Sequence, residues 1–251
     1  MASLVAYSES DSSSSDEDAG PCKRQRVGDA PTWTRNFAHV DGNWPSYVYF
    51  NGAVLRKNCH LIPIVVPMTA PMRTMMEHAI EQVDKAYAGR SLELISMDDP
   101  RSRPKKDTNE NPSFHLSLSR TFVLTFDQIE PFVKALRLAL KYRKRQRVGF
   151  QGHRILINDE RTRLFAAIPV IQGKAEVCHI IACVDRVMVE FGLEPYYANP
   201  VPHVSVASTP VVPDENAVET KASTPPPVVY HDCSVVAVTI GNKHYQIPLL
   251  R

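Results

Sequence analysis

Two periodicities of hydrophobic and polar residues run along this chain, and together they predict an α+β fold. Apolar residues at helical spacing predict three helices, over 71–88, 128–142 and 174–191. Runs of β-prone residues, alternating or continuously apolar, predict short strands. These strands cover residues 47–50, 61–66, 92–95, 114–119, 122–126, 148–157, 162–170, 203–207, 235–240 and 244–249.

Local signals fix the helix ends. Pro71 begins the first helix, and Gly89 and Gly192 follow the ends of the first and third. Asp127 and Glu130 have the spacing of a capping box at the start of the second helix.

The order of the elements predicts two similar halves. We expect hairpins between 114–118 and 122–126 and between 148–157 and 162–170. Each half contains one helix-flanked strand with a His-x-Ser sequence. The prediction is an α+β fold with two pseudo-symmetric lobes of antiparallel sheet and outer helices around a central groove.

Residues 1–40 are predicted to be a disordered tail, and residues 41–251 the folded domain. The tail has a Ser/Asp/Glu run at 8–18, too polar to form a core. The basic cluster at 22–27 has the composition of a nuclear localisation signal. Inside the domain, the polar and proline-rich stretches 97–112 and 208–228 are expected to be flexible loops.

Charge and cysteine content add modest constraints. The net charge of +2 hides a basic stretch at 141–147, which permits a polyanionic partner but equally suits the C-terminal end of a helix. The five cysteines are scattered without a C-x-x-C motif, which favours a reducing compartment. No apolar run approaches the roughly 18 residues of a membrane span, and no export signal is visible.

The strand at 114–119 carries the first candidate chemistry. Leu116 and Leu118 are predicted to face a core, while His115, Ser117 and Ser119 share the opposite face. An imidazole and two hydroxyls on one open face are unusual for a strand that serves only to pack. A lone histidine is more often structural, so this strand alone predicts little.

A second strand repeats the pattern. His203 and Ser205 alternate with apolar Val204 and Val206. Histidine exchanges protons near neutral pH, so two of them can serve as general base and general acid. The serine hydroxyls can donate to phosphate oxygens and to the charge that develops on them. This set suits attack of an RNA 2′-hydroxyl on its neighbouring phosphate, or opening of the cyclic phosphate, and requires no metal.

Other chemistries fit less well. A serine nucleophile would need an oxyanion loop, and no G-x-S-x-G occurs. Neither His-x-Ser motif has further ligands at zinc-site spacing, and 231–233 is too compact for a metal site. Tyr197 before the second strand suits base stacking, although anchoring the chain is an equal alternative.

The two motifs, at 114–119 and 203–207, resemble the paired H-x-[ST] motifs of the 2H phosphodiesterase superfamily. Further stretches resemble the branch of that superfamily that processes the uridine-rich 3′ end of U6 snRNA. They are Asp185–Met188, Glu190–Phe191, the Tyr197-x-x-Pro200-x-x-His203 spacing, Glu160–Phe165 and Gly241–Lys243. The resemblance covers residues 42–250.

The resemblance implies a metal-independent 3′→5′ exoribonuclease without a cofactor. Such an enzyme would act in the nucleus as a monomer, trim terminal uridines of U6 snRNA, and leave a 2′,3′-cyclic phosphate or a 3′-phosphate. The alternatives are a 2H cyclic phosphodiesterase or 2′-5′ oligonucleotide processor for other RNA, and a non-catalytic RNA-binding protein.

The resemblance also implies residue roles. By position, His115 and His203 are the acid–base pair, and Ser117 and Ser205 hold the phosphate. Tyr197 would stack on the terminal base. The further substrate contacts would be Leu116, Asn199, Pro200, Val201, Pro202, Val204 and Asp159, the last at a place where the family is expected to have an amide.

Overall fold

The structure is a computed structural model that describes residues 40, 42–51, 55–57, 60–62, 69–87, 93–94, 114–211 and 226–251. All of these belong to one compact unit, Phe37–Arg251. The predicted tail lies outside the described residues except for Val40, and so do the predicted loop at 97–112 and the core of the one at 208–228.

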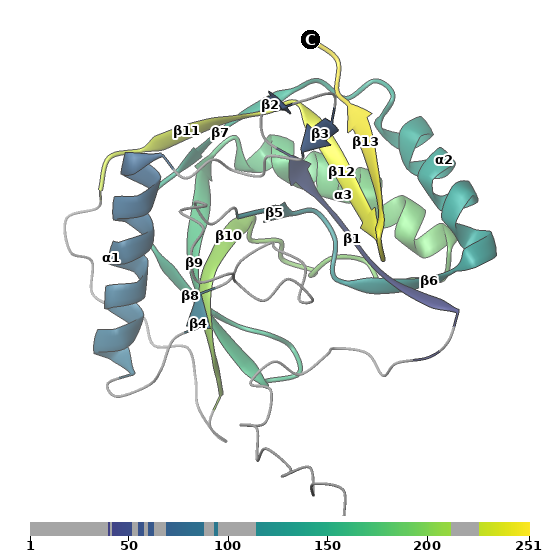
Figure 1. Ribbon diagram of the computed structural model, residues 1–251. Helices are drawn as coiled ribbons and strands as arrows, with labels where there is room; N and C mark the ends of the chain where they lie inside the picture. Colours follow the sequence, from purple (N-terminus) through teal and green to yellow (C-terminus); the bar gives the residue numbers. More distant parts are fainter. Residues whose placement is uncertain are drawn as a thin grey trace, which may run out of the picture. The chain divides into compact units, whose positions relative to one another are not determined.

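The helices and strands are shown in Figure 1. The helices are α1 (Ala70–Ala86), α2 (Ile129–Leu140) and α3 (Lys174–Glu190), with a 3₁₀ turn η1 (Phe126–Gln128) before α2. The strands are β1 (Asn43–Asn51), β2 (Leu55–Lys57), β3 (His60–Ile62), β4 (Glu93–Leu94), β5 (Leu116–Ser117), β6 (Phe122–Thr125), β7 (Gln146–Phe150), β8 (Arg154–Ile157), β9 (Arg163–Gln172), β10 (His203–Pro210), β11 (Val229–Cys233), β12 (Val235–Ile240) and β13 (Lys243–Pro248).

One large antiparallel sheet organises the domain, in the order β11-β7-β9-β10-β5-β1-β12-β13. The strands β4, β6 and β8 pair with β10, β1 and β9 beside this path, and β2 and β3 form a separate pair. Strand β5 joins the two halves of the sheet, because it pairs with β10 on one side and β1 on the other. The predicted α+β class with antiparallel sheet is confirmed.

The helices pack on the sheet through their apolar stripes. Helix α1 contacts β9 and β10, whereas α2 contacts α3 and β13 (Figure 1). Three methionines of α1, Met72, Met75 and Met76, are buried in the core. Thr69 caps this helix by accepting a hydrogen bond from the Met72 N–H at 3.4 Å.

The expected hairpin between 114–118 and 122–126 is wrong. Strands β5 and β6 both pair antiparallel with the long strand β1, and they therefore run in the same direction. Between them the chain stays attached to β1, because the Leu118 N–H donates to the Val48 carbonyl at 2.9 Å. Alternation of apolar residues predicted both strands correctly, but each of them pairs with β1 and not with the other.

The expected hairpin of 148–157 with 162–170 is confirmed for β8 and β9, but its first strand is broken. The chain between β7 and β8 passes through Gly152 at φ +74°, a backbone conformation that glycine adopts easily and most other residues do not. This turn divides the predicted strand in two. Both pieces then pair with successive parts of β9.

Three further features differ from the prediction. Strand β10 continues to Pro210, so the loop expected at 208–228 begins later, and β11 was not predicted at all. The second helix begins after η1, and the Gln128 side chain, rather than Glu130, accepts a hydrogen bond from the Thr125 N–H at 3.0 Å.

We predict that Phe132→Ala lowers the free energy of unfolding by about 3–5 kcal/mol, because it removes a buried ring and leaves a cavity. Phe132 lies between Phe122 and Phe191, with ring centroids at 5.1 and 5.2 Å. Urea denaturation measures the change. Leu138→Ala, on the exposed side of the same helix, is the matched control and should cost far less. Equal losses in both variants would contradict this packing.

Candidate active site

The register of two neighbouring strands builds the centre of the site. In the β5–β10 pair, Leu116 lies opposite Val204, and both side chains are 0% exposed in the core. One step along the antiparallel ladder therefore sets His115 opposite Ser205 and Ser117 opposite His203. These four side chains leave the sheet on the face away from the core, and all are partly accessible. The structure thus brings together the two predicted motifs.

Ser119 does not join them. The prediction placed it on the same face as His115 and Ser117, but its side chain is buried. Its Oγ accepts a hydrogen bond from the Val48 N–H at 2.9 Å. The period-two pattern fails here because β5 ends at Ser117 and the chain bends toward β1.

Two tyrosines from β1 surround His115. The ring centroids of Tyr47 and Tyr49 lie 6.0 and 5.9 Å from the imidazole. Tyr49 is held in turn by a contact of 3.4 Å between its hydroxyl and that of Thr239 on β12. Burial, and to a smaller extent the nearby His203, lowers the pKa of His115 to about 4. His115 is therefore neutral at pH 7.

His203 has a defined tautomer. Its Nδ1 lies 2.6 Å from the carbonyl oxygen of Val201, and a carbonyl can only accept, so Nδ1 carries a proton. This leaves Nε2 as the nitrogen that can take up or release a proton in a reaction. Burial lowers the pKa of His203, the bond to Val201 opposes that shift, and the charge of Arg154 adds to the lowering.

The two imidazoles are thus suited to proton transfer. Both favour the neutral form in the free protein, so either can act as a base. A phosphate bound between them brings negative charge, which favours protonation of one ring and prepares it as an acid. The serine hydroxyls on the same face can donate hydrogen bonds to that phosphate.

Tyr197 lies close to Arg120, a residue that no sequence motif indicated. The Arg120 guanidinium lies 4.1 Å from the Tyr197 ring centroid, and Tyr196 contacts the same ring at 5.0 Å in an edge arrangement. The Tyr197 side chain remains 36% exposed. Asp185 on α3 fixes this segment, since its Oδ1 accepts the Tyr196 N–H at 2.7 Å.

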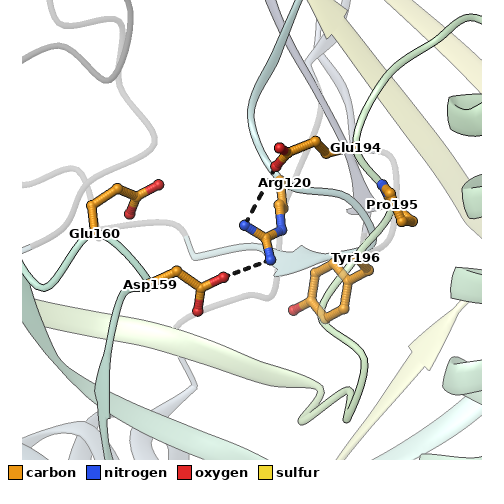
Figure 2. A pocket seen from close by; sticks show the side chains of 6 residues that line it. All are labelled: Arg120, Asp159, Glu160, Glu194, Pro195 and Tyr196. Atoms are coloured by element: carbon orange, nitrogen blue, oxygen red, sulfur yellow. Dashed lines mark hydrogen bonds and ion pairs between the residues drawn. The ribbon is translucent and has the colours of Figure 1, made fainter.

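Asp159 is held by the same arginine. Its Oδ2 lies 2.6 Å from Arg120 Nη2, and Glu194 lies 3.7 Å from Nη1. Figure 2 shows the guanidinium between these two carboxylates, with Tyr196 beside it. The ion pair joins the chain after β5 to the tip of the β8–β9 hairpin and offsets the negative charge of Asp159. The only sequence signal for Arg120 was its position just after the first motif.

An open cavity of about 600 Å³ borders this arginine cluster. Its lining consists of Arg120, Asp159, Glu160, Glu194, Pro195 and Tyr196 (Figure 2). The hairpin tip is kept in place by Asn158, whose Oδ1 accepts the N–H groups of Thr162 and Arg163 at 3.0 and 2.8 Å.

The remaining expected contacts differ in accessibility. Leu116 and Val204 are buried completely, so a substrate could reach only their main chain. Asn199 is exposed, and Pro200 and Val201 are partly exposed, just before His203. Pro202 is buried, with its carbonyl accepting the Val170 N–H at 2.9 Å.

The described residues contain no cluster of three His, Cys, Asp or Glu side chains placed to hold a metal ion. Cys178, Cys183 and Cys233 are free thiols. No helix in this part of the chain combines the length and apolarity needed to cross a membrane.

Comparison with known proteins gives consistent results. Residues 6–248 match the HVSL family, described as an uncharacterised conserved protein. U6 snRNA phosphodiesterase 1 of Drosophila melanogaster is 32% identical over 173 residues, 68% of this chain and 55% of that protein. The Homo sapiens protein of the same name is 31% identical over 173 residues, 69% of this chain and 53% of its own length. The chain thus spans about half the length of the curated relatives it matches.

Solved structures share the fold. Kluyveromyces marxianus Usb1 superimposes with a TM-score of 0.52 at 14% identity, covering 82% of this chain and 98% of that one. The same protein with uridine monophosphate gives a TM-score of 0.50 at 12% identity, with the same coverage. The resemblance to U6 snRNA phosphodiesterases in the sequence motifs is confirmed by the relatives' names.

The buried histidine predicts a pH dependence of stability. Between pH 6.5 and about 4, the unfolded chain protonates His115 while the folded chain does not, so the free energy of unfolding falls as the pH is lowered through this window. We expect His115→Asn to make that fall shallower in urea titrations at several pH values. His179→Asn, exposed on α3, is the control. Equal slopes in His115→Asn and the parent protein would contradict the lowered pKa.

Proposed function

We propose that this chain, which belongs to the HVSL family, is an RNA phosphodiesterase that shortens uridine-rich 3′ ends such as that of U6 snRNA. The observation that carries the proposal is the facing pair of His-x-Ser strands, His115 and Ser117 beside His203 and Ser205. The names of the curated relatives supply the substrate. The solved structure of Kluyveromyces marxianus Usb1 with uridine monophosphate supports a uridine ligand in this fold.

The reaction needs two proton transfers around one phosphate. One histidine removes the proton from the 2′-hydroxyl of the penultimate nucleotide, and the 2′-oxygen attacks the phosphorus. The bond from phosphorus to the 5′-oxygen of the terminal nucleotide breaks, and the second histidine gives that oxygen a proton. The RNA is left with a 2′,3′-cyclic phosphate, or with a 3′-phosphate when water opens the ring. Ser117 and Ser205 donate to the phosphate oxygens as charge develops.

The surroundings of this centre suit a single-stranded 3′ end. Tyr197 offers an exposed ring on which a terminal base can stack, with Asn199, Pro200 and Val201 along the same approach. Arg120 holds Asp159 beside it, so this carboxylate adds little repulsion toward RNA. We propose that the protein acts as a monomer and in the nucleus, where U6 snRNA phosphodiesterases would meet their substrate.

The two histidines give the first test. His115→Ala and His203→Ala should each lower the rate of shortening of a U-tailed RNA oligonucleotide by about 10²–10⁴-fold, in the presence of EDTA. His179→Ala is the matched control. End-group analysis on oligo(U) and oligo(A) reports the product and the base preference together. Full activity in the double variant would contradict the mechanism, and binding without shortening by the parent protein would favour a non-catalytic role.

Tyr197 gives the second test of the proposed function. Tyr197→Ala should weaken binding of oligo(U) by about 1–3 kcal/mol, the value of one base stacked on an aromatic ring, and should raise KM. Tyr197→Phe keeps the ring and should bind like the parent protein. Fluorescence anisotropy with a 2′-O-methyl oligo(U) measures the affinity without cleavage. Equal affinity in all three proteins would show that Tyr197 does not contribute to RNA binding.

A further inference from the structure

Arg154 stands at the end of the row of residues that contains the catalytic candidates. It lies opposite Ala167 in the β8–β9 pair, and Ala167 lies opposite Ser205 in the β9–β10 pair. Directly opposed residues of an antiparallel pair point to the same side of the sheet. The row therefore runs Arg154, Ala167, Ser205, His115 across four strands of the site face.

The strand between Arg154 and Ser205 carries only a small side chain on this face. Ala167 contributes only a methyl group to the intervening strand, so the long arginine side chain can lie across it. The charge of Arg154 acts on His203, whose pKa it lowers, which fits a guanidinium directed toward the centre of the site.

Arg154 also differs from Arg120 in its partners. Arg120 is held by Asp159 and Glu194, whereas Arg154 is exposed and makes no ion pair or side-chain hydrogen bond among the described residues. An exposed guanidinium beside a phosphate site, with no carboxylate to neutralise it, can bind phosphate through two parallel hydrogen bonds.

Distance decides which phosphate it can reach. Neighbouring strands lie about 4.8 Å apart, so β10 is roughly 10 Å from the Cα of Arg154, and the scissile phosphate between β5 and β10 lies farther still. An extended arginine side chain spans about 7 Å, six bonds of ~1.5 Å at staggered angles. The guanidinium therefore falls short of the scissile phosphate and suits the adjacent one.

We propose that Arg154 binds the phosphodiester immediately upstream of the scissile one, in the RNA strand that remains after cleavage. Arg154 then holds the strand that remains, while Tyr197 contacts the base of the departing nucleotide. The preferred substrate is accordingly an RNA with at least two phosphodiesters. This inference rests on the proposed function for its substrate.

Substrate length tests the assignment. UpU contains only the scissile phosphate, whereas UpUpU adds the upstream one. We expect the ratio of kcat/KM for UpUpU to that for UpU to fall about tenfold in Arg154→Gln, because the charge-assisted contact to the upstream phosphate is lost. The ratio should be partly retained in Arg154→Lys and fully retained in Arg186→Gln, the same charge change on an exposed position of α3. An unchanged ratio in Arg154→Gln, including an equal loss on both substrates, would overturn the proposal.

Two measurements do not depend on cleavage. Binding of 2′-O-methyl oligo(U) should weaken in Arg154→Gln, and the slope of log affinity against log salt should fall by about 0.7. The pKa of His203, followed by NMR, should rise in the same variant because a neighbouring cation is removed. Unaltered RNA affinity with an unaltered pKa would overturn the role of Arg154, whereas absence of cleavage in the parent protein would count only against the proposed function.

Discussion

A single residue pair between two strands determines the chemistry of this protein. Leu116 on β5 and Val204 on β10 lie opposite each other and are buried in the core, and this fixes the strand register there. A slip of one residue would turn the histidines and serines into the core and the aliphatic side chains out to water. The hydrophobic effect thus holds the polar set on the open face. Strand β5 has only two residues, so its position depends on the longer strands β1 and β10 on either side of it.

The same burial tunes the histidines. Each imidazole is only partly accessible, and its partial burial disfavours the charged form. Two neutral imidazoles close together avoid the repulsion of two cations in the free protein. An anionic phosphate reverses the balance for one of them, so the ligand itself prepares the acid that the reaction needs. No carboxylate partner for either ring is seen among the described residues.

The sequence predicted the parts of this site that depend on local alternation. Period-two patterning placed Leu116 in the core and His115 on the open face, and helical spacing placed α3 nearly to the residue. Prediction from the sequence failed where strand pairing or burial depends on residues that are distant in the sequence. The attachment of β6 to β1, the burial of Ser119 and the strand β11 all depend on a neighbour that no local pattern specifies. Arg120 and Arg154 were missed for the same reason, since an arginine has no pattern of its own and only the curl and register of the sheet bring it to the site.

The two motifs are alike in sequence, but their surroundings are not. His203 is fixed by the Val201 carbonyl, which favours its protonated form, and faces the cation Arg154, which opposes it. His115 instead lies among the rings of Tyr47 and Tyr49, and among the described residues only His203 acts electrostatically on its pKa. A symmetric phosphate bound between them would therefore meet two different proton donors. The direction in which the RNA strand binds then decides which imidazole faces the attacking oxygen and which faces the leaving oxygen.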